Sequence, residues 1–209
     1  FRLPAEFIRD LVLSSSGLLV RTIGGPSVKV YQPGGLWEAS TSGRGILTKY
    51  KQDHGPDLYR RGLYTFIKRT LPPPSMILSD ASYWEQGEGS LSKTNTPLQA
   101  LVMLNDPTVL EASRVLATKL TGESSRTQDK IEKAFRLIVC RKPLPKEAQL
   151  LNDYYNDQLQ TFSRQKQNAA KLLSVGEYPQ NDKVDKVADA ALMQVITTIY
   201  NLEETITKS

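Results

Sequence analysis

The stretch TNTPLQALVMLNDPTVLEASRVLATKL, residues 94–120, contains two helix starts in tandem and constrains the fold more than any other part of the chain. Thr96 and Asp106 are each followed by a proline. A capping side chain before proline is a specific start signal, because the first helical residue has no use for the N–H that proline lacks. The sequence therefore predicts two consecutive helices, beginning at Pro97 and Pro107.

Four other segments have the spacing of amphipathic helices. The first follows Pro4 and places Phe7, Ile8, Leu11 and Val12 on one face. The others run from near Ser125 to Cys140, from Pro145 to about Leu173, and from "VADAALMQV" to the chain end. We therefore predict a mainly α fold, a helical domain of about five to six helices, and interpret residues 1–209 as a single domain.

The N-terminal third is punctuated by glycine and proline, which predicts loop-rich segments at 24–57 and 72–94. Within it, "SVKVY" alternates as a short strand does, so one short hairpin is compatible with the pattern. Residues 58–70 fit a helix with Leu63, Phe66 and Ile67 inward, although "LYTFI" also fits a strand. We favour the helix, ended by three consecutive prolines.

The formal net charge of +5 is small for a chain of 209 residues, and no stacking platform accompanies it, so we predict no nucleic-acid partner. No apolar run reaches the roughly 20 residues that span a bilayer, so we predict no membrane span. The only cysteine, Cys140, closes the apolar run "FRLIVC". We expect this thiol to be buried and unpaired.

Catalytic signals are weak. The only histidine, His54, lies in "KQDHGPD", where we interpret it as a loop residue; a general base or ligand with Asp53 or Asp57 is the alternative. We predict no metal site and no cofactor. Calcium binding by the acidic residues of loop 80–88 is the alternative, although the loop departs from the calcium-hand pattern.

The segment YRRGLYTFIKRTLPPPSM, residues 59–76, combines basic, aromatic and proline residues. Guanidinium groups suit carboxylate, phosphate or sulfate ligands, yet they also stack on rings and bind carbonyls within a domain. We expect mainly the second use: a buried spine whose prolines cross the C-terminal helices. Some of its cations should pair with acids such as Asp80 or Asp106, which leaves at most one or two free to meet a ligand. The candidate ligand-binding residues are Arg60, Arg61, Tyr64, Lys68, Arg69, Asn95 and Gln99.

Taken together, "YRRGLYTFIKRTLPPPSM", "TNTPLQALVMLNDP" and "NLEETITKS" resemble the domain-of-unknown-function 1553 family, a C-terminal domain of large planctomycete proteins that often carry cytochrome-c-type domains. The resemblance extends over the whole chain. It implies a piece of an exported, multidomain protein, placed in the periplasm or secreted, with haem-binding modules or carbohydrate-related modules as neighbours. The chain has no Cys-x-x-Cys-His, so it binds no c-type haem covalently.

Two hypotheses follow. In the first, the chain is a non-catalytic binding or assembly domain of an exported bacterial protein, in contact with other domains of the same polypeptide and with an anionic or polysaccharide ligand. In the second, it is part of a hydrolytic or redox enzyme that acts on a polysaccharide and is completed by a partner domain. We favour the first, because no nucleophile is found with a base and an orienting group in the sequence.

Overall fold

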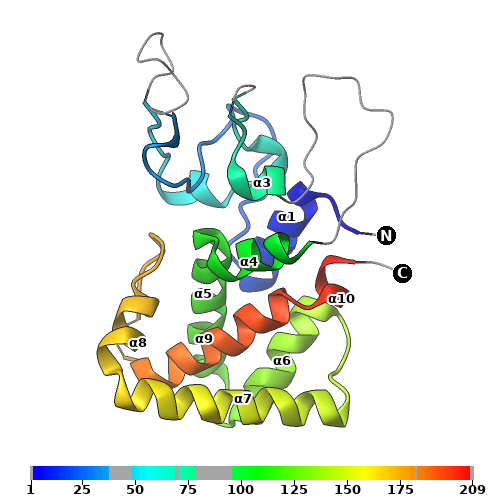
Figure 1. Cartoon of the computed structure of the whole chain (residues 1–209), viewed down its shortest axis with the longest axis vertical. Helices are drawn as coiled ribbons and strands as arrows, with labels where there is room; N and C mark the ends of the chain where they lie inside the picture. The colour runs from blue at the N-terminus through cyan, green and yellow to red at the C-terminus, as the bar shows by residue number, and fades with distance from the viewer. Residues whose placement is uncertain (1, 38–48, 69–70, 79–95, 182, 208–209) are drawn as a thin grey trace.

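A computed structural model describes residues 2–37, 49–68, 71–78, 96–181 and 183–207 (Figure 1). The described residues are mainly helical, which confirms the predicted fold class. The helices are α1 (Ala5–Ser16), α3 (Pro74–Leu78), α4 (Pro97–Asn105), α5 (Pro107–Glu123), α6 (Thr127–Val139), α7 (Pro145–Arg164), α8 (Lys166–Leu173), α9 (Lys186–Tyr200) and α10 (Glu203–Ile206). Two 3₁₀ helices, η1 (Gly55–Tyr59) and η2 (Gly62–Tyr64), lie between α1 and α3.

Both tandem helix starts are confirmed. The Asp106 side chain accepts a hydrogen bond from Thr108 N at the start of α5, and Gln99 Oε1 accepts one from Thr96 N at the start of α4. These bonds satisfy N–H groups that a helix start otherwise leaves unpaired. The two helices are therefore adjacent and share Asp106 as the end of one and the cap of the next.

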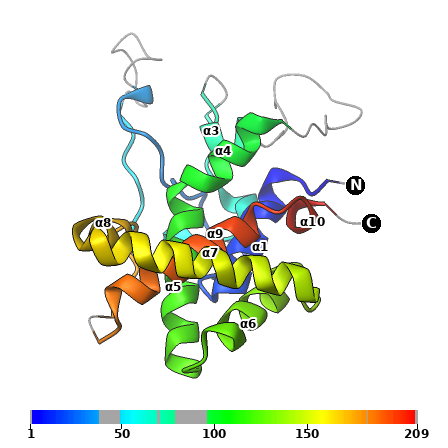
Figure 2. The ribbon, with the colours of Figure 1, turned by 60° about the horizontal axis from the view of Figure 1, so that its bottom comes forward.

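Helix α9 forms the centre of the bundle, with α5, α6, α7 and α8 packed around it (Figures 1 and 2). Its buried residues run along the helix from Ala190 to Tyr200 and include Leu192, Met193 and Ile196. A single cluster of buried apolar side chains extends from Ile8 in α1 to Ile206 in α10. Burial of this apolar area is the main favourable contribution to the stability of the fold.

The N- and C-terminal segments of the described chain pair with each other (Figure 1). Leu3 N donates to Ile206 O at 2.8 Å, and Arg2 forms a single antiparallel bridge with Thr207. Arg2 Nη1 also donates to Gln99 Oε1, so the two chain ends meet beside the start of α4.

The helix expected over residues 58–70 does not form. Among the described residues of this segment, backbone groups pair with residues 20–28 instead: Val20 N donates to Tyr59 O, and Val28 N donates to Tyr64 O. These are isolated bridges, so the expected hairpin is not formed within the described residues either. Tertiary pairing has overridden the local helical spacing, and Leu63, expected inward, is exposed.

Several boundaries also differ from the predictions. The helix expected from Pro145 to Leu173 is interrupted at Gln165, whose φ of -124° and ψ of 54° leave the helical region. The terminal helix is interrupted at Asn201 and Leu202, which separate α9 from α10. A short helix, α3, lies in the segment 72–94 that was predicted to be loop-rich. It begins at Pro74 and packs against α4, whereas the prolines were expected to cross the C-terminal helices.

Burial of Cys140 was predicted wrongly. Helix α6 ends at Val139, and Cys140 turns the chain out of the helix with a φ of 65°. The thiol is free and exposed, because the residue no longer belongs to the apolar face that "FRLIVC" suggested.

Candidate functional site

The basic side chains of the 59–76 segment are used inside the fold wherever the structure describes them. Arg60 is buried, and its guanidinium donates to the carbonyl oxygens of Pro26 at 2.6 Å and of Gly24. It also stacks on Tyr64 at 3.9 Å from the ring centroid, and Tyr64 Oη accepts a hydrogen bond from Gly24 N. Arg60 and Tyr64 therefore hold the loop that contains Gly24.

Other candidate ligand-binding residues are placed apart from one another. Arg61 Nε donates to Asp10 Oδ2 at 2.8 Å, and Lys68 Nζ lies 4.4 Å from the centroid of a Trp37 ring. Gln99 is buried beside the chain ends, as described above. Arg69, Asn95 and Asp80 lie outside the described residues. The ligand-binding roles of all seven candidates stay a prediction.

A buried carboxylate, Glu111 of α5, is the centre of a polar cluster that joins several segments of the chain. Tyr31 Oη and Tyr59 Oη each donate to it at 3.0 Å, and Tyr178 N donates at 2.6 Å. The fourth neighbour is Arg114, with Nη2 at 3.8 Å from Glu111 Oε1. Burial, followed by the neighbouring Glu111 charge, raises the pKa of both Tyr31 and Tyr59 above the ordinary value.

The Glu111 cluster anchors the loop between α8 and α9. Arg114 donates to the carbonyl oxygens of Val175 and Tyr178, and Glu177 N donates to Tyr31 Oη. Because donors and acceptors here are matched within the protein and the side chain of Arg114 is only 3% exposed, the arrangement is structural. His54 lies at its edge, where Nδ1 is 2.7 Å from Glu177 Oε1 in an exposed position.

A pocket of about 50 Å³ lies between α1, α3, α4 and α5. Apolar side chains from these four helices and from residue 30 form most of its wall: Ala5, Ile8, Val12, Val30, Met76, Val102, Met103 and Val109. The backbone pairing of Val28 with residues 64–66 brings the neighbouring residues Val30 and Thr65 to the same wall. This is a concave apolar site with few polar groups, the usual character of a small-ligand pocket.

The polar groups of the pocket are Arg9, Thr65, Ser75, Asp106 and Thr108. Arg9 Nη2 donates to Leu58 O at 2.5 Å and Nη1 donates to Thr108 Oγ1 at 3.3 Å. Burial lowers the pKa of the Arg9 guanidinium, and the charges of Asp106 and Asp10 act in the opposite direction. The pocket therefore contains a partly buried cation and mainly apolar walls. Its described lining includes no histidine or cysteine.

The sequence did not single out this pocket. Arg9 follows Ile8 in α1 and fits the polar face of an amphipathic helix, and nothing in the sequence near Thr65 distinguishes it from a strand threonine. The pocket lies between the proline-rich segment and α4, the helix that begins at Pro97. Met76 and Met103 show that these two elements do meet there.

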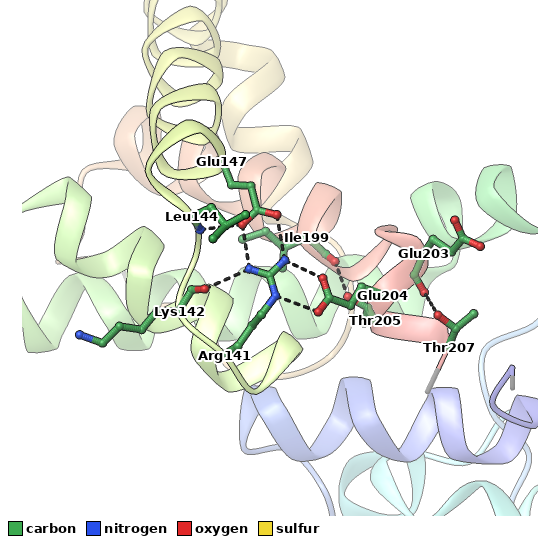
Figure 3. A network of polar contacts seen from close by, with 9 residues as sticks. All are labelled: Arg141, Lys142, Leu144, Glu147, Ile199, Glu203, Glu204, Thr205 and Thr207. Carbon is green, nitrogen blue, oxygen red and sulfur yellow. Dashed lines mark hydrogen bonds and ion pairs between the residues drawn. The ribbon is translucent and has the colours of Figure 1, made fainter. Parts of the chain in front are cut away.

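A second polar network ties the C-terminal turn to α7 (Figure 3). Arg141 forms bidentate contacts with Glu147, through Nη1 and Nη2 at 2.8 Å each, and with Glu204, through Nε at 2.8 Å and Nη2 at 2.6 Å. Glu147 also accepts a hydrogen bond from Leu144 N. These contacts, with that of Arg141 first, lower the pKa of Glu147 to about 2.

Acid should therefore weaken this network at a lower pH than an ordinary glutamate would require. A carboxyl whose pKa is depressed by folding stabilises the protein above its unfolded pKa, roughly 4.3, and the contribution is lost as the pH falls to about 2. We expect Glu147→Gln to flatten the fall in melting temperature over this pH range. Because the pair is a third exposed, the effect should be modest and should shrink in high salt.

The matched control is Asp153→Asn, which removes an exposed carboxylate from the same helix, α7. It should leave the acid profile of the parent protein in place. Melting curves recorded between pH 5 and pH 2 decide the question: equal flattening by the two substitutions would show that the Arg141 contact contributes nothing specific.

Among the residues that the structure describes, no group of three or more histidine, cysteine or acidic side chains is arranged to hold a metal ion. The acidic loop 80–88 lies outside those residues. None of the described helices is long and apolar enough to cross a membrane.

Comparison with known proteins gives one match. A family model described as PSD1, protein of unknown function (DUF1553), matches residues 1–155, about three quarters of the chain. The match ends inside α7 (Pro145–Arg164). No curated protein and no solved structure matches the chain significantly.

Proposed function

We propose that this chain, which belongs to the DUF1553 family of proteins of unknown function, is a non-catalytic binding and assembly domain of an exported multidomain bacterial protein. The observation that carries the proposal is the outer face of α4. Leu98, Leu101 and Leu104 are 49%, 55% and 41% exposed, and their spacing of three residues places them along one side of the helix. Apolar side chains gathered on a surface are typical of an interaction site.

The position of α4 favours another domain of the same polypeptide as the partner. Arg2 contacts Gln99 in the first turn of α4, and Leu3 is paired with Ile206. Arg2 and its partner Thr207 thus lie near the first turn of α4, so a domain connected through either of them would start close to this helix. A short connection keeps such a domain at a high effective concentration, so a modest apolar surface is sufficient for docking.

The polar chemistry supports binding over catalysis. Where the structure describes the candidate cations, they hold carbonyl oxygens, rings or carboxylates of the chain itself, and His54 lies at an exposed edge away from the pocket. Arg61, with 45% of its side chain exposed, is the described member of the basic segment best placed to meet an anionic polysaccharide. Export to the periplasm or beyond, where such polymers occur, is part of the proposal.

The test uses the polypeptide that carries this chain in the cell and measures hydrogen exchange of the α4 amides. We expect slow exchange in the parent protein and faster exchange in Leu101→Asp, because a charge at the docking face displaces the partner domain. The control is Leu150→Asp on α7, where the leucine is 60% exposed. Equal exchange of α4 in both variants, or turnover of an anionic polysaccharide by the purified protein, would reject the proposal.

A further inference from the structure

The pocket between α1, α3, α4 and α5 contains two buried hydrogen-bond donors without a partner among the residues that the structure describes. They are Arg9 Nε and the hydroxyl group of Thr65, a residue only 6% exposed. Both residues line the same pocket. Buried donors are nearly always satisfied in folded proteins, so two of them at one pocket indicate an acceptor that the described part of the chain does not supply.

The charge at the pocket indicates an anionic acceptor. The terminal nitrogens of Arg9 bind neutral oxygens, those of Leu58 and Thr108. Within the described residues no carboxylate lies at ion-pair distance from Arg9. The nearby acids are committed elsewhere: Asp106 caps α5, and Asp10 binds Arg61 and Gly62 N. The partly buried cation has therefore lost part of its hydration without gaining an ion-pair partner among the described residues.

The walls and size of the pocket restrict the rest of the ligand. Beyond the two donors, valine, isoleucine, alanine and methionine side chains form most of the surface, and Ser75, Thr108 and the α5-capping Asp106 are its other polar groups. Since one water needs roughly 10–15 Å³ of such space, about 50 Å³ corresponds to roughly three to five water-sized positions, which suits a carboxylate with a short alkyl chain. Guanidinium groups bind carboxylates through pairs of N–H donors, and Arg9 Nε is free to be one of them.

We infer that this pocket binds the carboxylate of a short aliphatic acid, with Arg9 Nε and Thr65 Oγ1 donating to its oxygens and the alkyl chain against Val12, Val102 and Met103. The inference rests on the proposed binding function, since it names a ligand for a domain that does not catalyse. It uses the inner side of α4, whereas the docking face of Leu98, Leu101 and Leu104 is the outer side.

The experiment measures butyrate binding to the purified protein by calorimetry, with butyramide and butylamine as neutral and cationic isosteres. We expect butyrate to bind, butyramide to bind at least tenfold more weakly, and butylamine not to bind. From acetate to butyrate the affinity should rise about fourfold per methylene, which corresponds to about 0.8 kcal/mol for each buried methylene group.

Three variants localise the binding. Thr65→Val should weaken butyrate binding about tenfold. It should not destabilise the protein, because the hydroxyl group has no hydrogen-bond partner among the described residues. Arg9→Met should abolish binding, and Arg21→Met, at an exposed arginine outside the pocket, should change nothing. If Arg9→Met fails to fold, the butyrate affinity of Thr65→Val tests the inference by itself.

Failure to detect butyrate binding, equal affinity for butyramide, or unchanged affinity in Thr65→Val would overturn the inference. Such a result would leave the α4 exchange experiment untouched, so failure of the ligand assignment can be distinguished from failure of the proposed assembly function.

Discussion

Glu111→Ala should lower the free energy of unfolding by about 3–5 kcal/mol, the range measured when one partner of a buried ion pair is removed. The substitution leaves the Arg114 charge uncompensated and removes the acceptor for Tyr31 Oη, Tyr59 Oη and Tyr178 N. Each of these groups is costly to leave unpaired away from water. Urea denaturation of the parent and variant proteins measures the difference.

The control for this prediction is Glu123→Ala in the same helix, α5. Glu123 pairs with Lys133 at the surface, where ion pairs contribute little, so the denaturation midpoint should scarcely move. A second readout is local: Glu111→Ala should make the loop of residues 174–181 sensitive to proteases, because Tyr178 and Val175 are held through this cluster. The interpretation fails if both variants denature alike and the loop stays resistant.

The elements that could be predicted from the sequence are those whose signals are local. Asp106 accepts from Thr108 N two residues later, and Gln99 accepts from Thr96 N three residues earlier, so both start signals are local and both predicted starts were correct. Gly17 ends α1 with a φ of 87°, which glycine adopts at low cost. Such signals do not depend on the rest of the fold.

The errors concern residues whose surroundings are set by distant segments. Some cations of the 59–76 segment were expected to pair with acids; Arg61 does, with Asp10, but the partners of Arg60 are carbonyl oxygens 34 and 36 residues away. Phe7 has the spacing of the inward face of α1 and is 56% exposed, whereas Leu13 is buried. A helix shows which residues share a face, but the neighbours decide which face is covered.

The pocket could not be predicted for the same reason. It joins Arg9 of α1 to Thr65 of an irregular segment and to Val102 of α4, with no common motif. The Glu111 cluster likewise combines Tyr31, Tyr59 and Tyr178 from three separate segments. Polar groups that act together only after folding leave no pattern of spacing in the sequence.

Gly62→Ala should destabilise the protein by about 1–3 kcal/mol, the usual cost of inserting a methyl group into a closely packed site. A Cβ atom at this position would lie 2.7 Å from both the Cα atom and the carbonyl oxygen of Glu6. These are backbone atoms of α1, so relief requires movement of the helix or of η2. This close approach of η2 to α1 also lets Gly62 N donate a hydrogen bond to Asp10 Oδ1 and lets Arg61 Nε donate to Asp10 Oδ2.

The control is Gly122→Ala near the end of α5, where no atom beyond the helix itself lies within 4 Å of the added Cβ. That variant should be more stable than the parent by about 0.5–1 kcal/mol, since alanine loses less conformational entropy in a helix than glycine does. The same substitution, glycine to alanine, should therefore lower the melting temperature at residue 62 and raise it at residue 122, and thermal melts of both variants measure the two changes. If Gly62→Ala melted at or above the parent temperature, α1 and η2 would not be in the close contact that positions Arg9 and Thr65 around the pocket.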